Sequence, residues 1–418
     1  MMRNIKAVSL LFACIFMIPM FASCSTRSTI NIVKVEAKEL QEPDSLDSAI
    51  RTVALGTEDF AFKLSAELSK NIKNENFVCS PYSVWLPLAA LVNATDAKDQ
   101  DALLNSLNAS GISIDDINRA SSWMLNNLAK LTDGYNPIKT ANAIFVNKDF
   151  TIRKDFAQKF MDFYMGNSIS VDFKSKNAVK VVNDWASKQT NGLIPNLVQQ
   201  FDPDTISAIA NAIYFSDRWQ WEFKPEETTE GIFYSQEGDK NAFYMLHEGN
   251  GQVYYEDDTV QAITLPFKTG SSMYIILPKS GDANGLFSSM TREYFNKIQN
   301  ESIQSTGKLL LPRFSIESDV KGLNDALIAM GVPLFDETIS GLIEENIPVF
   351  ISDVMQKAVI KVDEKGTTAA AVTVMAMRGS AGPKPTEAFE MICNKPFVFI
   401  LYNYDSEQIL FTGVVNKP

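Results

Sequence analysis

Residues 358–385 read AVIKVDEKGTTAAAVTVMAMRGSAGPKP, in which a strand-like run leads through a charged turn into small, uncharged residues. The small and β-branched residues 367–377 can enter a β-sheet, whereas the glycine- and proline-rich sequence after them cannot easily stay in one. In a strand, Thr367 and every second residue up to Met377 point to one face, and Arg378 falls on the other. The part before Arg378 can therefore slide between two strands without burying a charge. Taken alone, the segment favours an ordinary strand followed by a long surface loop.

The composition of the chain restricts the chemistry that it can perform. The 418 residues are 45% hydrophobic, which excludes wholesale disorder and allows a large core. The net charge of −12 repels phosphate backbones, so we expect no nucleic-acid partner. The single histidine, His247, excludes sites that need two imidazoles and leaves only one candidate base for a serine or cysteine nucleophile. We therefore expect a protein that is not an enzyme and has no metal or cofactor, with His247 as an ordinary strand or surface residue.

The first residues have the pattern of an export signal. Arg3 and Lys6 precede an apolar run over residues 7–22, which is shorter than a stable membrane span. The run ends in Phe-Ala-Ser-Cys at Cys24, which resembles the bacterial lipobox except that phenylalanine stands where leucine is preferred. We expect a signal peptide over residues 1–23 and a lipoprotein anchored through Cys24 to the bacterial envelope. Its location would be the outer membrane, on the periplasmic or the surface face; ordinary secretion with cleavage nearby is the alternative.

The rest of the chain reads as a tether and one large domain. Residues 24–51 are polar and mixed, as in a flexible tether. Residues 52–418 contain no Gly/Ser linker, low-complexity segment or repeat, which predicts a single domain. Cys79 and Cys393 lie in apolar, strand-like stretches, where a cysteine usually behaves as a small hydrophobic residue. We expect both to be unpaired, although an oxidising compartment would permit a disulfide.

Helical patterns come early in this domain and strand patterns late. Apolar residues from Phe60 to Ile72 follow a helical stripe, and residues 84–92 predict a buried helix after Ser80-Pro81. Strand-like runs follow at residues 143–146, 208–215, 273–277 and 396–401. This order favours an α+β fold over a doubly wound α/β sheet. The chain has no nucleotide-binding glycine motif and no GxSxG nucleophile elbow.

Nine short motifs lie in a fixed order between residues 76 and 415. They are NFVCSPYS at 76–83, VNDW with Thr190, Gly192 and Ile194 at 182–194, NAIYFSDRW at 211–219, LPF at 265–267, ILP at 276–278, LPRF at 311–314, MG at 330–331, NKPF at 394–397 and ILFTGVV at 409–415. Each motif alone is weak, but together they resemble the serpin family along the whole mature domain. Asp217 departs from the family pattern, which usually has glycine there.

The resemblance implies a fold of three β-sheets and about eight or nine helices, with an exposed reactive-site loop at about residues 364–390. It also implies a suicide inhibitor of serine endopeptidases, and in some cases of cysteine endopeptidases. The protease cleaves the loop and forms an acyl-enzyme, and the cleaved loop then inserts as a strand into the central sheet and distorts the protease. Such a fold is kinetically trapped, needs no catalytic group of its own and is expected to act as a monomer.

The hinge sequence bears on whether the chain can inhibit. In the family, inhibitors carry Glu-x-Gly, then threonine and small residues. The matching residues here are Glu364, Gly366, Thr367, Thr368, Ala369, Ala370 and Ala371. We therefore expect an inhibitor. The alternative is a non-inhibitory serpin that acts as a binding protein or as a protease substrate.

Two counts place the scissile bond differently. Counted forward from Glu364 over the usual family interval, the bond is Ser380–Ala381; counted back from Asn394, it falls at Pro385. We adopt Ser380–Ala381, because the inserting segment must span the sheet and so has a fixed length.

Neighbouring residues offer other cleavage points. These alternatives are Met377, Arg378 and Gly379. Arg378 suits trypsin-like enzymes, whereas Met377 and Ala381 suit chymotrypsin-like or elastase-like enzymes. A loop with several usable bonds predicts broad specificity.

Further residues match family positions beneath the loop. Ser80, Ser83 and Asn211 match the family's shutter region, whose polar side chains hold the central strands of the large sheet apart or let them part. Gln356 stands where the family usually has histidine, and a glutamine can both donate and accept hydrogen bonds. Trp219 matches the tryptophan of the breach, the point where the loop first enters the sheet.

Overall fold

The computed structural model describes residues 30–36, 47–70, 72, 74–129, 137–190, 192, 194–335, 339–367 and 388–418. Within these residues the chain forms nine α-helices and three hydrogen-bonded β-sheets. The α+β class and the expected numbers of sheets and helices are confirmed. No helix in the described part of the chain is both long and apolar enough to span a membrane.

Six of the nine helices precede residue 190. The helices are α1 (Ser48–Ser69), α2 (Pro81–Leu91), α3 (Ala97–Ser106), α4 (Ile114–Ala129), α5 (Lys154–Tyr164), α6 (Ala178–Gln189), α7 (Ala283–Ser289), α8 (Arg292–Glu301) and α9 (Leu323–Ala329), with short 3-10 turns at Pro225–Glu227 and Pro333–Phe335. The Asp47 carboxylate accepts a hydrogen bond from the Ile50 amide (2.9 Å) and caps α1. Pro81 occupies the first turn of α2, where a missing N–H costs nothing. Both helices predicted from periodicity are therefore present.

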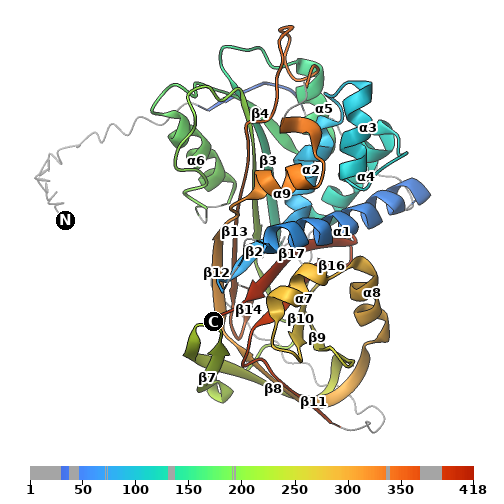
Figure 1. Cartoon of the computed structure of the whole chain (residues 1–418), viewed down its shortest axis with the longest axis vertical. Helices are drawn as coiled ribbons and strands as arrows, with labels where there is room; N and C mark the ends of the chain where they lie inside the picture. Colours follow the sequence, from blue (N-terminus) through green and yellow to red (C-terminus); the bar gives the residue numbers. More distant parts are fainter. Residues whose placement is uncertain are drawn as a thin grey trace, which may run out of the picture.

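The strands of a six-stranded sheet run along the long axis of the molecule (Figure 1). Its order is β1 (Asn31–Ile32), β4 (Gly166–Val171), β3 (Ile138–Asn147), β5 (Ser207–Phe215), β13 (Asp353–Val362) and β12 (Phe314–Asp319). Helix α6 covers one face, where Trp185 packs edge-on against Phe145 at 5.5 Å. The other face joins the main hydrophobic core, which includes the fully buried α2.

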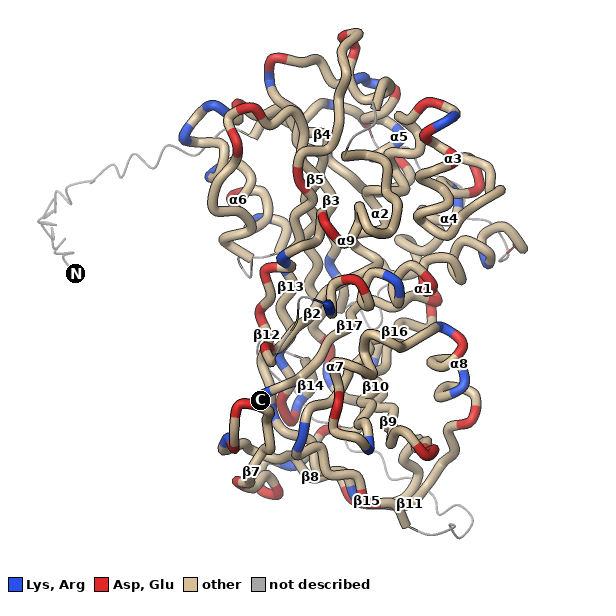
Figure 2. Tube along the Cα trace, in the orientation of Figure 1, with Lys and Arg blue, Asp and Glu red and all other residues tan. Residues whose placement is uncertain are grey.

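A nine-stranded sheet packs around the rest of this core. Its strands are β15 (Phe389–Ile392), β11 (Ile303–Pro312), β8 (Gly238–Glu256), β9 (Val260–Pro266), β10 (Ser271–Pro278), β16 (Phe397–Asn403), β17 (Gln408–Val415) and β2 (Phe77–Cys79), with β7 (Thr229–Ser235) paired to β8. A third, two-stranded sheet joins β6 (Asp217–Arg218) to β14 (Gly366–Thr367). Figure 2 shows charged residues over the outer helices and turns, whereas β5, of sequence SAIANAIYF, carries none.

The polar tether differs from its expected length of residues 24–51. Asn31 and Ile32 form β1 by pairing with Ser170 and Ile169 of β4, so this part of the chain is an edge strand. Val33 packs against the main core, and α1 already begins at Ser48. Ile30, Val33 and Val35, which flank β1, explain the difference, because they are partly buried against the core where this segment joins the sheet.

Candidate functional site

The six-stranded sheet is open between two of its interior strands, the parallel neighbours β5 and β13. β5 and β13 pair over five residues, and the last pair joins Ala212 to Lys357. Beyond this pair, within the described residues, residues 213–215 of β5 pair only with β3, and residues 358–362 of β13 pair only with β12. The facing backbone edges of β5 and β13 are thus available to another strand over this length.

The chain turns back at the end of β13, and the next strand, β14, pairs with β6, which directly follows the open end of β5. The Asp363 amide donates to the Gly366 carbonyl (3.0 Å), and β14 then pairs antiparallel with β6. Gly366 has φ +143°, and a Cβ there would overlap the backbone oxygen of Asp217. Glycine is therefore required for this close approach. Thr367 is 2% exposed, and its hydroxyl accepts a hydrogen bond from the Asp217 amide (3.3 Å).

Glu364 ties the turn to neighbouring strands. Its Oε1 accepts hydrogen bonds from Arg313 Nε (2.7 Å) and Thr228 Oγ1 (2.6 Å), and it forms an ion pair with the Arg313 guanidinium. The Glu364 side chain is only 8% exposed. Burial alone would raise the pKa of Glu364, but the hydrogen bonds from Arg313 and Thr228 outweigh it and hold the pKa below its usual range. Glu364 is therefore a charged anchor of the hinge.

Trp219 lies beneath the same turn. Its indole Nε1 donates to the Asp363 carbonyl (2.9 Å), and its backbone amide donates to the Lys365 carbonyl (2.9 Å). The ring is fully buried and stacks on Phe267 at 4.3 Å. The backbone amide of Phe223 adds a bond to the Glu364 carbonyl (2.9 Å). The predicted breach residue is thus the floor on which the hinge turn rests.

Asp217, the departure from the family pattern, has a local structural reason. Its buried carboxylate accepts hydrogen bonds from the Arg218 amide (2.7 Å) and from the amide (3.1 Å) and hydroxyl of Thr269. Burial raises the pKa of Asp217 in spite of these bonds. The carboxylate connects β6 to the turn that follows β9.

Three of the predicted shutter residues are in direct contact. Gln356 Oε1 accepts a bond from the Ser80 amide (2.9 Å), and its Nε2 donates to the Ser80 carbonyl (2.8 Å) and to Ser83 Oγ (2.7 Å). All three side chains are buried. Gln356 therefore connects β13 to the start of α2 at the residue pair Gln356–Asn211, where β13 faces β5.

Asn211, the fourth predicted shutter residue, forms its side-chain hydrogen bond with β3 and not with the start of α2. Its Nδ2 donates to Asn142 Oδ1 (2.6 Å), and Asn142 Nδ2 donates to the Tyr164 carbonyl (3.1 Å). Motif matching missed this link to β3 and α5, although a lone asparagine directly before the apolar run at 143–146 was a visible signal. It also missed Arg313 and Thr228, whose partner Glu364 is distant in sequence.

Other predicted residues lie outside the described residues. These are Cys24 in the lipobox, Thr368, Ala369, Ala370 and Ala371 in the hinge, and Met377, Arg378, Gly379, Ser380 and Ala381 around the scissile bond. Their assigned roles stay predictions.

The other chemically reactive side chains singled out from the sequence are two cysteines and one histidine. Cys79 and Cys393 are buried and free, as expected, and burial raises the pKa of Cys79 to about 12. His247 lies half-buried in β8, and burial lowers its pKa. Within the described part of the chain, no group of three or more His, Cys, Asp or Glu side chains is arranged to hold a metal ion.

Comparison with known sequences gives one family. Residues 55–418 match the family model described as Serpin (serine protease inhibitor). Alpha-1-antiproteinase of Mus saxicola is 29% identical over 394 residues, covering 91% of this chain and 94% of that protein. An uncharacterized serpin-like protein of Thermococcus kodakarensis is 30% identical over 370 residues, covering 86% and 84% of the two chains.

Solved structures agree with the sequence matches. The native state of the thermophilic serpin tengpin superposes with a TM-score of 0.81 at 25% identity, covering 93% of this chain and all of that chain. Thyroxine-binding globulin in complex with thyroxine has a TM-score of 0.78 at 22% identity, covering 87% and 99% of the two chains, which shows the shared fold alone. With the family model matching from residue 55 to the last residue, this chain belongs to the serpin family.

Proposed function

We propose that this serpin inhibits serine endopeptidases by inserting its cleaved reactive-site loop between β5 and β13. The observation that carries the proposal is the open pair of strand edges beside a hinge with the inhibitory sequence pattern. The hinge residues Glu364 to Thr367 hold the start of the loop at this opening. Similarity to alpha-1-antiproteinase, a relative named for acting against proteinases, supports the proposal.

The proposed reaction begins as ordinary proteolysis. The protease serine hydroxyl attacks the carbonyl carbon before the scissile bond, at Ser380–Ala381 or at a neighbouring bond. The C–N bond breaks, an ester to the protease forms, and the new amine becomes the N-terminus of the C-terminal peptide, whose strands β15, β16 and β17 stay in the nine-stranded sheet. The loop from Thr368 onward then enters the sheet while the ester is still intact, so the protease is carried along.

Backbone pairing drives the insertion. Over the open length, a new strand gains ladder partners on residues 213–215 of β5 and 358–362 of β13, each bond contributing a net stabilisation of about 0.5–1.5 kcal/mol. Further along, the new strand replaces the five pairs between β5 and β13 with pairs to both strands. One face of this strand lies against the main core, next to Ile213, Phe215 and Ile360. Small, uncharged loop residues can occupy that face, whereas a charge would cost several kcal/mol. The sequence after the hinge meets this requirement.

The test is incubation of the mature protein with trypsin, chymotrypsin and elastase, followed by denaturing gel electrophoresis. We expect a stable band near the sum of the two masses. Mass spectrometry of the released peptide identifies its first residue, expected to be Ala381. If all three enzymes cleave the loop and none gives such a band, the protein does not trap proteases of these three classes.

The second candidate is a non-inhibitory serpin that binds a ligand or is only cut. The similarity to thyroxine-binding globulin favours keeping it, because that structure is a complex with a small molecule on the same fold. The gel separates the two functions: a substrate serpin gives cleaved chain and free protease, whereas an inhibitor gives the joined species.

We also propose export and lipid anchoring through Cys24, supported by the signal-like sequence before it. Expression in a bacterial host with a labelled fatty acid should label the wild-type protein. Cys24→Ser should lose the label and release the protein from membranes, while Cys14→Ser, inside the apolar run, is the matched control and should keep both. Equal labelling of Cys24→Ser and wild type contradicts the proposal.

A further inference from the structure

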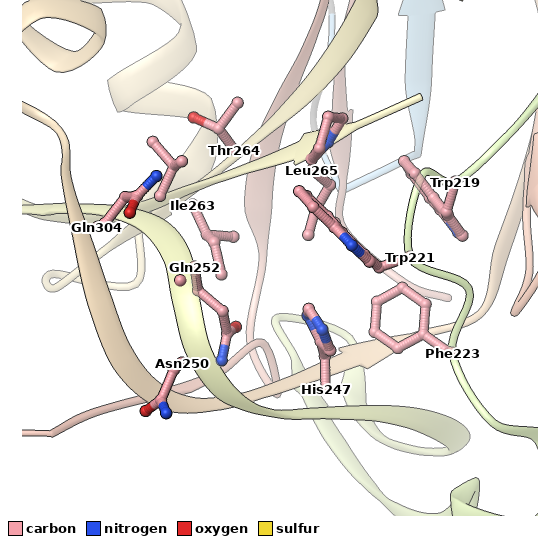
Figure 3. Close-up of a pocket in the computed structure, with 13 residues that line it drawn as sticks. Trp219, Trp221, Phe223, His247, Asn250, Gln252, Ile263, Thr264, Leu265 and Gln304 are labelled. Atoms are coloured by element: carbon pink, nitrogen blue, oxygen red, sulfur yellow. The ribbon is translucent and has the colours of Figure 1, made fainter. Parts of the chain in front are cut away.

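A pocket of about 350 Å³ is lined partly by Trp219 and Phe223, whose backbone amides hold the hinge turn, and otherwise by strands of the nine-stranded sheet (Figure 3). Its walls come from the segment after β6 and from β8, β9 and β11. The lining residues that carry the argument are Trp219, Trp221, Phe223, His247, Gln252 and Leu265. Its volume is within the range of sites that bind small molecules.

The pocket contains a buried acceptor with no partner. Gln252 is 5% exposed, and its Nε2 donates to the carbonyls of Gly307 (2.7 Å) and Gly249 (3.2 Å). Because both partners are acceptors, the orientation of the amide is determined, and its other end is the oxygen. Among the described residues, Gln252 Oε1 has no hydrogen-bond partner. An unsatisfied buried acceptor is unusual in a native protein, and a ligand that donates to it removes its cost.

Aromatic rings form one side of the pocket. Trp221 is 56% exposed at the rim, while Trp219 and Phe223 pack edge-on at 6.2 Å deeper in the wall. His247 packs edge-on against Phe223 at 5.7 Å, on the same side of the pocket as the Gln252 amide in Figure 3. Trp221 offers most of the flat apolar surface to a ring of the ligand, with the buried Phe223 and Trp219 behind it.

The pocket is also uncharged at neutral pH. None of its lining residues is Asp, Glu, Lys or Arg. Burial lowers the pKa of His247, so the imidazole is neutral at pH 7 and offers one donor and one acceptor nitrogen. A charged ligand would find no counter-ion here and would lose its hydration. The chemistry therefore selects a neutral molecule.

We propose that this pocket binds a neutral, flat, amphipathic molecule of the phenol or indole class. Its ring packs against Trp221 and Phe223, and its O–H or N–H donates to Gln252 Oε1. Leu265 contributes to the apolar part of the pocket.

Two residues that line the pocket, Trp219 and Phe223, also hydrogen-bond to the hinge turn, so ligand binding is coupled to the conformation of the hinge. Trp219 donates to the carbonyls of Asp363 and Lys365, and the Phe223 amide donates to the Glu364 carbonyl. A ligand packed on Phe223, whose ring in turn packs against Trp219, stabilises the arrangement in which these three bonds exist. By linkage, its affinity differs between the intact protein and the protein with an inserted loop. This coupling rests on the proposed inhibitory function; the pocket itself does not.

The first test uses 2-naphthol, which is neutral at pH 7 and carries one O–H, and 2-methylnaphthalene, which has the same ring system and no donor. Titration calorimetry and tryptophan fluorescence on the mature chain should show saturable, one-to-one binding of 2-naphthol. Binding of 2-methylnaphthalene should be at least tenfold weaker. No saturable binding of 2-naphthol up to millimolar concentration overturns the site, and equal affinity of the two probes overturns the role of Gln252 Oε1.

Variants then locate the binding. Trp221→Ala, at an exposed position, should weaken 2-naphthol at least tenfold, whereas Tyr234→Ala, a similarly exposed aromatic (54%) outside the pocket, should not change it. Circular dichroism melting confirms that both variants are folded. An unchanged affinity in Trp221→Ala overturns the assignment of the pocket.

The last measurement separates the coupling from the pocket. The affinity for 2-naphthol is compared between the intact protein and protein nicked in the loop, and a difference of at least threefold is expected. Equal affinities overturn the coupling and leave the pocket in place. Failure to trap any protease, with 2-naphthol binding intact, overturns the inhibitory function instead.

Discussion

Gly366 is the residue at which the hinge approaches β6 most closely. With φ +143° and the Asp217 oxygen where a Cβ would have to lie, Gly366→Ala should lower the free energy of unfolding by about 2–4 kcal/mol, through backbone strain and displacement of β14. Gly111→Ala is the matched control: φ is +76°, nothing lies within 4 Å, and only the smaller cost of about 1 kcal/mol is expected. Urea unfolding measures both, and equal losses would contradict the steric role of Gly366.

Glu364 gives a second prediction at this scale, in its pH dependence. Because its pKa is lowered in the folded state, its stabilising contribution is present above the unfolded value of about 4.5 and is lost as the pH falls through the folded pKa. Glu364→Gln should lower the free energy of unfolding by about 1 kcal/mol at pH 7, a modest loss because Arg313 is 43% exposed.

The difference between Glu364→Gln and wild type should shrink on acidification below pH 4.5. Glu67→Gln, which breaks the surface pair with Lys70 (2.5 Å), is the control and should cost less than about 0.5 kcal/mol. Urea unfolding at several pH values tests this. A difference that stays constant down to the lowest pH would show that the Glu364 charge does not stabilise the hinge.

At the scale of the elements, a loop that enters between the open edges of β5 and β13 must carry no charge on the residues that become buried. Thr367→Arg should convert the protein into a substrate, because a charge entering the sheet costs several kcal/mol and slows insertion below ester hydrolysis. Gel assays should then show cleaved chain and active protease. Thr367→Val keeps the size without the charge and should still trap.

Thr367 is already buried against β6, so an arginine there can disturb the intact protein as well as the insertion. A second arginine variant, further along the loop, therefore tests insertion separately. Ala369→Arg places the charge two residues further along the same strand face. Unimpaired complex formation by both arginine variants would contradict insertion of this segment.

At the scale of the whole molecule, the proposed insertion requires the intact protein to be less stable than the cleaved protein. If the cleaved loop becomes a strand between β5 and β13 and adds on the order of 10 kcal/mol, nicked protein should melt about 10 °C above intact protein, since each kcal/mol shifts the Tm of a 418-residue chain by about 1 °C. Calorimetry of both forms, with protease-free protein carried through the same steps as control, measures the shift. An unchanged Tm after nicking would favour the non-inhibitory alternative.

At the level of elements, local patterns predicted two of the nine helices in the described residues and several of the long strands. The helix at 81–91, the second half of the helix at 48–69 and the strands β5, β10 and β16 appear where periodicity and apolar runs predict them. Local patterns suffice for these elements, because each needs only the right side-chain spacing to bury one face. The edge strand at 31–32 was missed, because two residues are too short for any period to show.

The site was predictable only in part. Glu364, Gly366 and Thr367 were identified by motif, but the partner of Glu364 is Arg313, fifty-one positions earlier. Gln356 was expected to serve the shutter; its contact with Ser80 spans 276 positions. No local pattern encodes such pairs, because they depend on which strands and helices come together.

The amino-acid sequence alone thus determines three features: the helices and strands that local patterns predict, the family that the ordered motifs indicate, and the uncharged segment after Gly366. Each of these features depends only on residues that are neighbours along the chain. The opening between β5 and β13, the floor that Trp219 provides and, among the described residues, the unpartnered oxygen of Gln252 were decided by tertiary structure alone. Each of these depends on the register of strands far apart in sequence. Register is set by packing of the whole core, which no single stretch of the chain contains.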